Sequence, residues 1–240
     1  MRYLVELQYD GSRFNGFQRL NEERTVQKEL EDALTIINKS SVEVKGAGRT
    51  DRGVHAYGQR AHFDLGFEIP TDRLKTALND ILADDIYVSN VEVVNKDFHA
   101  RFNVEKKIYQ YKINKGEFDP LKSNYYYQYK YDFDISKLKE IASLFIGVHN
   151  FKNFVSGKRD NYEAIIYDIK IEEDNDIITI TFEGKSFYRY MVRNLVGAIL
   201  DVARNKASID DVKSMLEDYN KEHHLSCAPA NGLYLVKIYY

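Results

Sequence analysis

The start of the chain places an apolar residue at every second position from Tyr3 to Tyr9. This alternation is typical of a half-buried strand. From Val26 to Ile37 the apolar residues recur instead at helical spacing, and Thr25 precedes them as a candidate N-cap. The pattern therefore predicts a strand followed by an amphipathic helix.

The next segments complete the first half of the chain. We expect a short strand at 42–45 and a longer one around 60–65, where polar and apolar residues alternate. A helix is expected to begin near Thr71, with its apolar residues facing inward at Leu74, Ala77, Leu78, Ile81 and Leu82. A strand at Ile86–Val94 follows. The resulting order, β-α-β-β-α-β, is that of a ferredoxin-like fold.

The second half shows a similar order with additions. Strands are expected at 107–113, 165–171, 178–182 and 233–239, and the acidic run 172–176 is expected to be a hairpin turn. Helices are expected at 135–145, ended by Gly147, at 187–203, and from Ser208 onward. A tyrosine-rich insertion occupies 125–131.

Together these elements predict an α+β fold of two ferredoxin-like (RRM-like) halves. The first domain would span residues 1–100 and the second residues 101–240. We expect the two sheets to join edge to edge into one mostly antiparallel sheet with helices packed on it. A cleft is expected between the halves.

Composition narrows the class of protein. The chain has 240 residues, of which 44% are hydrophobic and only 3 are proline, as in globular proteins. No apolar run approaches the roughly 18 residues that span a membrane, and the N-terminus has no signal-peptide core. The single cysteine, Cys227, allows no internal disulfide and fits a reducing compartment. We therefore expect a cytoplasmic protein without membrane contact.

The net charge of -3 gives no overall attraction for nucleic acid, so the local distribution of charge matters more. Basic residues gather in four groups, each of which taken alone is more often a solvated face. These groups are Arg49, Arg52 and Arg60; Arg101, Lys106 and Lys107; Lys152, Lys158 and Arg159; and Arg189 and Arg193.

One turn stands out within the first group. Between Gly46 and Ala56, the carboxylate of Asp51 lies between Arg49 and Arg52 in a glycine-bounded segment. Flanking guanidinium groups favour the ionised carboxylate and attract polyanions. The pattern indicates an aspartate that acts on a phosphate-bearing molecule. The alternative is an ordinary polar hairpin loop.

Arg193 is unusual because it lies in a helix that is apolar nearly all round. A buried arginine needs a carboxylate or phosphate partner, or must extend to solvent beside Arg189. If the two halves face each other, Asp51 is a suitable partner.

Tyr109 follows the cations Lys106 and Lys107, an arrangement that RNA-binding proteins use for base stacking. With 19 tyrosines in the chain, a core role for Tyr109 stays open.

The sequence lacks the motifs of several other classes of enzyme and binding protein. The sequence has no phosphate-binding P-loop and no dinucleotide-binding glycine turn. His223, His224 and Cys227 could hold a metal, but without a second ligand cluster we expect no metal. A metal-dependent nuclease would need a group of carboxylates that the sequence does not offer.

Seven segments match a known family in the family's order and cover essentially the whole chain. They are residues 9–18, 48–56, 98–102, 109–111, 147–151, 191–194 and 229–234. With these motifs the chain resembles the tRNA pseudouridine synthase A family (TruA). The resemblance implies an isomerase without a cofactor that converts uridine to pseudouridine in tRNA. The sites implied are positions 38, 39 and 40 of the anticodon stem-loop, and a homodimer is implied as the working form.

The resemblance also assigns roles to residues of this chain. Asp51 would be the nucleophile, attacking either C6 of the uracil or C1′ of the ribose. Tyr109 would stack on the base and could remove the C5 proton, while Arg193 would pair with Asp51. Leu233 would pack against the uracil, and Arg49 would line the pocket.

Two further arginines complete the expected RNA-binding set. Arg101 lies in the motif at 98–102, and Arg52 stands where many family members have a small residue. The added charge of Arg52 leaves the choice of RNA open. The same chemistry on large-subunit ribosomal RNA is one alternative. A non-catalytic RNA-binding protein is another, although the sequence lacks the aromatic RNP1 run of RRM domains.

Overall fold

The computed structural model describes residues 1–132, 134–218 and 225–240. The chain divides into two compact units. Unit 1 comprises Met1–Glu105 and Tyr234–Tyr240, and unit 2 comprises Lys106–Leu233. Each unit has strands and helices of its own, and most strand pairs are antiparallel, which supports an α+β fold.

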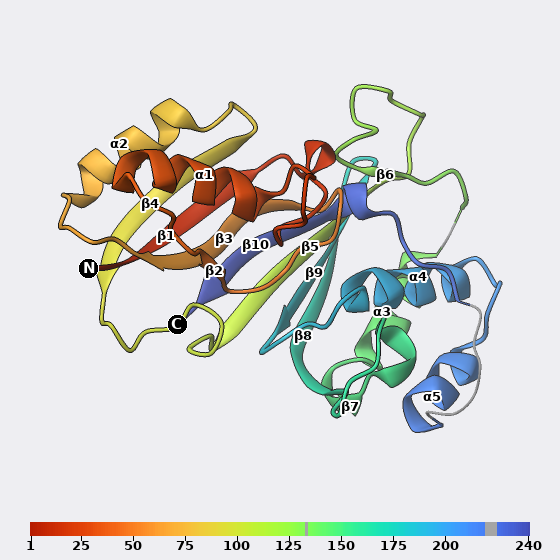
Figure 1. Ribbon diagram of the computed structural model, residues 1–240. Helices are drawn as coiled ribbons and strands as arrows, with labels where there is room; N and C mark the ends of the chain where they lie inside the picture. Colours follow the sequence, from red (N-terminus) through yellow and green to blue (C-terminus); the bar gives the residue numbers. More distant parts are fainter. Residues whose placement is uncertain (133, 219–224) are drawn as a thin grey trace. The chain divides into compact units, whose positions relative to one another are not determined.

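Unit 1 has the predicted order β-α-β-β-α-β. Its elements are β1 (Arg2–Tyr9), the 3-10 turn η1 (Gly11–Arg13), α1 (Val26–Asn38), β2 (Lys45–Gly46), β3 (His55–Asp64), α2 (Thr71–Ile81), β4 (Ile86–Val94) and β10 (Leu233–Tyr239). β1 lies between β3 and β4 and is antiparallel to both. β2 is antiparallel to β3, whereas β10 is parallel to it. Both helices lie on the same face of this sheet (Figure 1).

The α1 helix begins where the sequence predicts, because the Thr25 hydroxyl accepts a hydrogen bond from the Lys28 backbone N–H at 3.3 Å. β2 is shorter than expected, since only Lys45 and Gly46 pair with β3. Ile81 does not face inward as predicted. It ends α2 and is 39% exposed, while Leu82 leaves the helix in an extended conformation and is buried.

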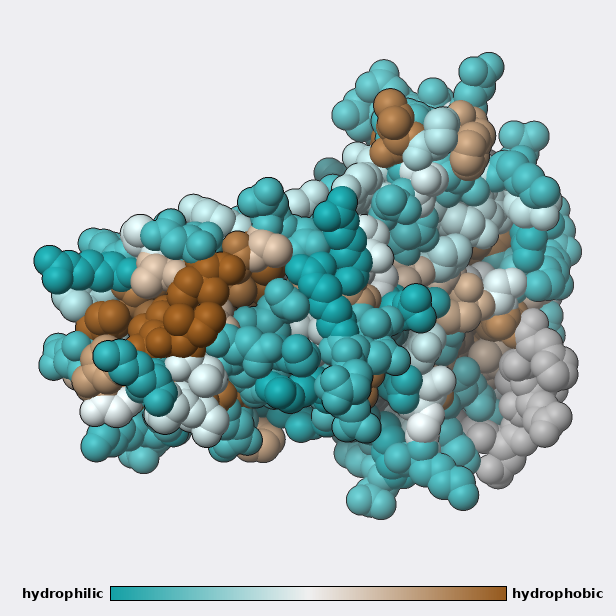
Figure 2. Space-filling model, turned by 45° about the horizontal axis from the view of Figure 1, so that its top comes forward, coloured by the Kyte–Doolittle hydropathy of each residue, from teal (hydrophilic) through white to brown (hydrophobic). Residues whose placement is uncertain are grey.

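The helices of unit 1 also carry apolar side chains on their outer side. Figure 2 shows a hydrophobic patch over the region of α1 and α2, on a face that is otherwise mostly hydrophilic. Ile36 of α1 is 64% exposed and Ile81 of α2 is 39% exposed. Within the described parts of the chain, no helix is both long enough and apolar enough to cross a membrane.

The main strands of unit 2 lie in the order β5-β9-β8-β7, and each is antiparallel to the next. Its strands are β5 (Lys106–Asn114), β6 (Tyr127–Gln128), β7 (Gly147–Asn150), β8 (Glu163–Asp174) and β9 (Ile177–Gly184). Its helices are α3 (Ile135–Ser143), α4 (Met191–Ala203) and α5 (Ile209–Glu217), with 3-10 turns η2 (Lys152–Phe154) and η3 (Ala230–Gly232). α3 packs against α4 and β8.

Three features of unit 2 differ from the prediction. β7 was not expected, and Gly147 begins this strand rather than ending α3. In β8 the register shifts between Ile166 and Asp168, so the buried positions change from Ala164 and Ile166 to Ile171. The bulge explains why strict alternation failed there, since one extra residue turns the strand over.

α4 begins at Met191 instead of near residue 187. Tyr190, just before the helix, has a φ of 63°, which is left-handed and cannot continue an α-helix.

The C-terminal strand also differs from the predicted division at residue 100. β10 is grouped with unit 1 because Tyr234 and Leu235 pair with His55 and Ala56 of β3. The two ends of the predicted second domain, residues 101–105 and 234–240, are therefore grouped with unit 1.

Candidate active site

Asp51 lies in the turn between β2 and β3 of unit 1, and its side chain is half-buried. The Val54 N–H donates to the Asp51 carbonyl oxygen at 3.1 Å, and Gly53 has a φ of 81° that favours glycine. Arg49 and Arg52 on either side are exposed. The turn therefore holds one carboxylate between two solvent-exposed guanidinium groups.

A second segment, residues 10–18, packs directly onto this turn. A side chain at Gly11 would place its Cβ 2.0 Å from the Val54 carbonyl oxygen, and one at Gly16 would approach the Thr50 carbonyl oxygen to 2.8 Å. The Phe17 N–H donates to that same Thr50 oxygen at 3.1 Å. Both glycines are thus needed for backbone-to-backbone contact, which fixes the turn on one side.

Side chains from β1 and β3 fix the turn on the other side. The hydroxyls of Tyr9 and Thr50 are hydrogen-bonded at 2.9 Å, and the Gln59 amide donates to the Gly48 carbonyl oxygen at 3.0 Å. Burial raises the pKa of Tyr9 to about 12, so its phenol stays neutral at physiological pH. The Gly11 N–H donates to Nδ1 of His55 at 3.0 Å, and the His55 ring stacks on Tyr234.

Arg101 lies elsewhere in unit 1. Its neighbour Ala100 donates a backbone hydrogen bond to Nδ1 of His62 at 3.1 Å, so this segment is held at the far part of β3. The seven residue steps from His55 to His62 correspond to about 23 Å of strand. Arg101 is exposed and is not part of the Asp51 turn.

Tyr109 is on β5 of unit 2 and is only 6% exposed. Its ring contacts Phe187 edge to face at 5.2 Å between centroids. Gly184 makes room for Phe187, since a Cβ there would come within 2.9 Å of that ring. Tyr109 therefore sits in a packed aromatic environment with a defined ring orientation.

Arg193 is in the first turn of α4 and is partly buried. Its Nε donates to the Ala228 carbonyl oxygen at 2.7 Å, and its guanidinium lies 4.7 Å from the centre of the Tyr190 ring. Tyr111, on the same face of β5 as Tyr109, is close enough for the Arg193 charge to act on it. Burial raises the pKa of Tyr111, and the Arg193 charge opposes that rise.

Leu233 is the first residue of β10 and is 5% exposed. It follows Gly232, where a side chain would come within 2.8 Å of both the Tyr111 ring and the Lys112 carbonyl oxygen. The Tyr111 hydroxyl also donates to the Pro229 carbonyl oxygen at 2.7 Å. The chain before Leu233 is thus packed closely against β5.

The predicted residues fall into three groups. Arg49, Asp51 and Arg52 share one turn of unit 1; Tyr109, Arg193 and Leu233 are in unit 2; and Arg101 lies apart from the Asp51 turn. The pairing of Asp51 with Arg193 remains a prediction. Sequence reasoning missed the residues that hold the two groups, namely Tyr9, His55, Gln59, Tyr190 and Ala228. The motif 9–18 pointed to part of this set, because it begins at Tyr9.

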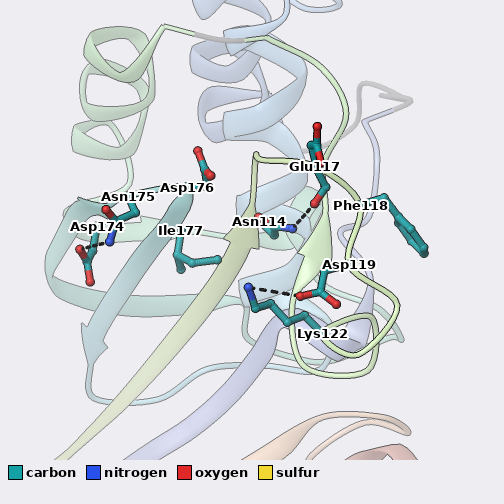
Figure 3. A pocket seen from close by; sticks show the side chains of 9 residues that line it. All are labelled: Asn114, Glu117, Phe118, Asp119, Lys122, Asp174, Asn175, Asp176 and Ile177. Atoms are coloured by element: carbon teal, nitrogen blue, oxygen red, sulfur yellow. Dashed lines mark hydrogen bonds and ion pairs between the residues drawn. The ribbon is translucent and has the colours of Figure 1, made fainter.

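A separate hollow of about 520 Å³ lies in unit 2, between the loop after β5 and the turn joining β8 to β9 (Figure 3). Its lining includes four carboxylates and one lysine, Lys122, which pairs with Asp119 at 3.3 Å. None of the predicted site residues lines it. An acidic lining repels phosphate and so disfavours RNA in this hollow.

Within residues 1–132, 134–218 and 225–240, no group of three or more His, Cys, Asp or Glu side chains is arranged to hold a metal ion. Cys227, one of the three residues that the sequence offered as possible metal ligands, is exposed. His223 and His224 lie outside the described residues.

The chain is similar to known proteins over its whole length. The sequence model of a family described as tRNA pseudouridine synthase matches residues 7–103 and 141–240. A tRNA pseudouridine synthase A of Bacillus subtilis (strain 168) is 40% identical, over 100% of this chain and 99% of the relative. One of Thermosipho africanus (strain TCF52B) is 41% identical, over 99% of this chain and 98% of the relative.

Among solved structures, a chain from a Cbf5–Nop10–Gar1 complex is similar over 98% of this chain and 58% of that chain. The TM-score is 0.40 and the identity 10%.

Proposed function

This chain belongs to the tRNA pseudouridine synthase family, and from that premise we propose that it converts uridine to pseudouridine at positions 38, 39 and 40 of tRNA with Asp51 as the nucleophile. The observation that carries the proposal is the Asp51 turn. Its carboxylate is half-buried between two exposed arginines, and the turn is fixed from both sides by backbone and side-chain contacts.

The reaction rearranges the substrate without gain or loss of atoms. The Asp51 carboxylate attacks the nucleotide at C6 of the uracil or at C1′ of the ribose. The bond between N1 and C1′ breaks, the base turns, and C5 bonds to C1′. The bond between Asp51 and the nucleotide breaks in turn, by displacement from C1′ or by elimination from C6, which restores the free carboxylate. The proton on C5 is then removed and one is returned to N1. Because these steps need only a nucleophile and a proton carrier, we propose that no cofactor takes part.

The proposed partners of Asp51 come from unit 2. Tyr109 would stack on the uracil and accept the C5 proton, and Leu233 would pack against the base. Arg193 would pair with Asp51 and orient its carboxylate. These contacts require the two units to face each other across a catalytic cleft with their sheets joined, which is part of the proposal.

Binding of the RNA would depend on exposed cations. A uridine within a stem must be flipped out of the stack, at a cost of a few kcal/mol, before it can reach a nucleophile. Arg49 and Arg52 are exposed and flank Asp51 in the sequence, and both would bind the RNA near the reacting nucleotide. Arg101 follows Ala100, which is bonded to the far part of β3, and it would contact the RNA at a distance from the reacting base. We further propose that the enzyme works as a homodimer in the cytoplasm.

The test is pseudouridine mapping after incubation with unmodified tRNA or unmodified large-subunit rRNA. We compare the wild type with Asp51→Asn and with Asp72→Asn, a matched control in which an exposed aspartate of α2 is changed. Asp51→Asn is expected to lower the rate at least about 1,000-fold, because an amide is a poor nucleophile, with RNA affinity within about 2-fold of the wild type. Asp72→Asn and addition of EDTA are expected to leave the rate unchanged.

The outcomes separate the alternatives. Product in the anticodon arm that depends on Asp51 supports the proposal, whereas product only on rRNA overturns the assignment of tRNA. RNA binding without product on either substrate supports a binding protein instead. Parallel loss of affinity and rate in Asp51→Asn contradicts the role of Asp51 as nucleophile.

A further inference from the structure

The side chain of Asp201 is buried in unit 2, close to the last turn of α4, although it carries a carboxylate. It is only 1% exposed and receives hydrogen bonds from the Ser226 N–H at 2.7 Å and from the Ser226 hydroxyl at 3.0 Å. Arg204 donates to it at 2.6 Å, and Lys206 lies 3.4 Å away. Burial raises the pKa of Asp201, but these hydrogen bonds and charges outweigh the effect and hold the pKa below its usual value. The carboxylate is therefore a charged anchor at neutral pH.

What Asp201 anchors is the extended segment Ser226–Ala228, which we call the anchor segment. This segment runs against α4 in the direct vicinity of Gly197. A Cβ at Gly197 would come within 1.6 Å of the Ser226 carbonyl oxygen, so only glycine permits the observed contact. Asp201 and Gly197 are four residues apart on α4, and both act on the same residue of the segment.

The other end of the anchor segment holds Arg193. The Ala228 N–H donates to the Arg193 carbonyl oxygen at 3.0 Å, and Nε of Arg193 donates to the Ala228 carbonyl oxygen at 2.7 Å. An arginine side chain has several rotatable bonds and loses up to about 2 kcal/mol of conformational freedom when fixed. The carbonyl of Ala228 and the ring of Tyr190 restrict Arg193 before any RNA arrives.

From these contacts we infer that Asp201 is a positioning residue for pseudouridine formation, which acts on Arg193 through the anchor segment. The path runs from the Asp201 carboxylate to Ser226, along the backbone to Ala228, and from its carbonyl to Nε of Arg193. The inference rests on the proposed function, because it assumes that Arg193 orients Asp51. A shift of about 1 Å in an orienting group can cost on the order of 100-fold in rate.

The experiment measures single-turnover rates at saturating tRNA, tRNA affinity and melting temperature for a set of variants. Asp201→Asn leaves an amide in place of the carboxylate, and we expect the rate to fall about 10- to 100-fold with affinity within about 2-fold. Gly197→Ala pushes the segment away by its Cβ and is expected to act in the same way. Ser226→Ala removes the hydroxyl with its bonds to Asp201, Lys206 and Arg204, but keeps the backbone N–H bond to Asp201, and a loss of about 3-fold is expected.

Two comparisons distinguish positioning from general destabilisation. Val212→Ala creates a small cavity under α5 and is the control, because it lowers the melting temperature without touching the anchor segment. Its rate is expected to equal that of the wild type at a temperature where it is folded. In the background of Arg193→Lys, Asp201→Asn is expected to add less than about 2-fold, since both act through the same side chain.

A wild type without activity, or an active Asp51→Asn, would contradict the proposed function rather than this inference. If the wild type is active and Asp51→Asn is not, full activity in folded Asp201→Asn overturns the inference. It is also overturned if the rate losses of Asp201→Asn and Arg193→Lys multiply in the double variant. If Asp201→Asn and Gly197→Ala do not fold, Ser226→Ala decides, and an unchanged rate in that variant counts against the inference.

Discussion

Asp51 and Arg193, the two charged residues that the proposed mechanism brings together, are held in different ways. Asp51 belongs to a short turn whose backbone is fixed by neighbouring backbone, with glycines at the points of contact. Arg193 belongs to a helix, and its side chain is fixed by a carbonyl group 35 residues away in the sequence. One site is positioned through its main chain and the other through its side chain.

The difference has a physical basis in the length of the side chains. Asp51 has a short side chain, so fixing the turn also fixes the carboxylate within a small volume. Arg193 has a long side chain, and a rigid helix alone leaves its guanidinium free to move over several ångströms. A second contact near the charged end is therefore needed, and Ala228 supplies it. Substitutions that disturb the main chain should thus affect the two sites unequally.

The largest effect is expected from Gly11→Ala in unit 1. Its Cβ would meet the Val54 carbonyl oxygen at 2.0 Å, a clash that only a shift of the Asp51 turn can relieve. We expect a loss of stability of about 2–4 kcal/mol, measured by chemical denaturation, together with loss of activity. The control is Gly66→Ala, where the nearest atom lies at 4.0 Å and the cost should stay within about 0.5 kcal/mol. Equal stability of the two variants would refute the main-chain account of this site.

A smaller effect is expected from acid, and it should act on unit 1. Burial, together with the nearby His99 and Arg2, lowers the pKa of His62 to about 4, and its Nδ1 accepts the Ala100 hydrogen bond only when unprotonated. The unfolded chain binds this proton near pH 6.5, so the free energy of unfolding should fall as pH drops from about 6.5 toward 4. A pKa difference of about 2.5 corresponds to roughly 3 kcal/mol.

The measurement is the melting temperature against pH for the wild type, His62→Gln and His149→Gln. His62→Gln keeps a neutral acceptor and should flatten the acid slope. His149 is half-buried in β7 and is the control, with a slope like that of the wild type. If His149→Gln flattened the slope and His62→Gln did not, the acid sensitivity would belong to unit 2.

The smallest effect is expected from removing one hydroxyl in each unit. Tyr9→Phe loses the bond to Thr50, and Tyr111→Phe loses the bond to Pro229. Each should cost about 1 kcal/mol in the free energy of unfolding, measured by denaturation. Their rates should differ, because Tyr9 supports an already fixed turn, whereas Tyr111 holds the chain next to Ala228. A larger fall in rate for Tyr9→Phe than for Tyr111→Phe would reverse the comparison.

The sequence predicted local features of the fold well and long-range ones poorly. The strands Ile86–Val94 and Leu233–Tyr239, the cap Thr25 and the helix start at Ser208 depend on neighbouring residues, and the structure has them where expected. The bulge in β8 and the left-handed Tyr190 depend on what packs against the chain from elsewhere. No periodicity in a single segment reports such contacts.

The candidate site follows the same rule. The Asp51 turn was found because glycines and arginines adjoin the aspartate in the sequence. The holding of Arg193 by Ala228 was not found, because an alanine carbonyl has no signature in the sequence. The Asp201 carboxylate was also overlooked, since an aspartate near a helix end is usually a surface residue.

The parallel pairing of β10 with β3 has a consequence for synthesis of the protein. Unit 1 is begun first, but residues 234–240 leave the ribosome only after the whole of unit 2. Protein domains are commonly folded in the order in which they emerge, and here the uninterrupted unit 2 can be complete before unit 1 is. Until then the His55 end of β3 is paired with β1 on one side but lacks β10 on the other, and exposed strand edges promote aggregation. A ribosome stalled late in translation would therefore present a nascent chain that chaperones must shield.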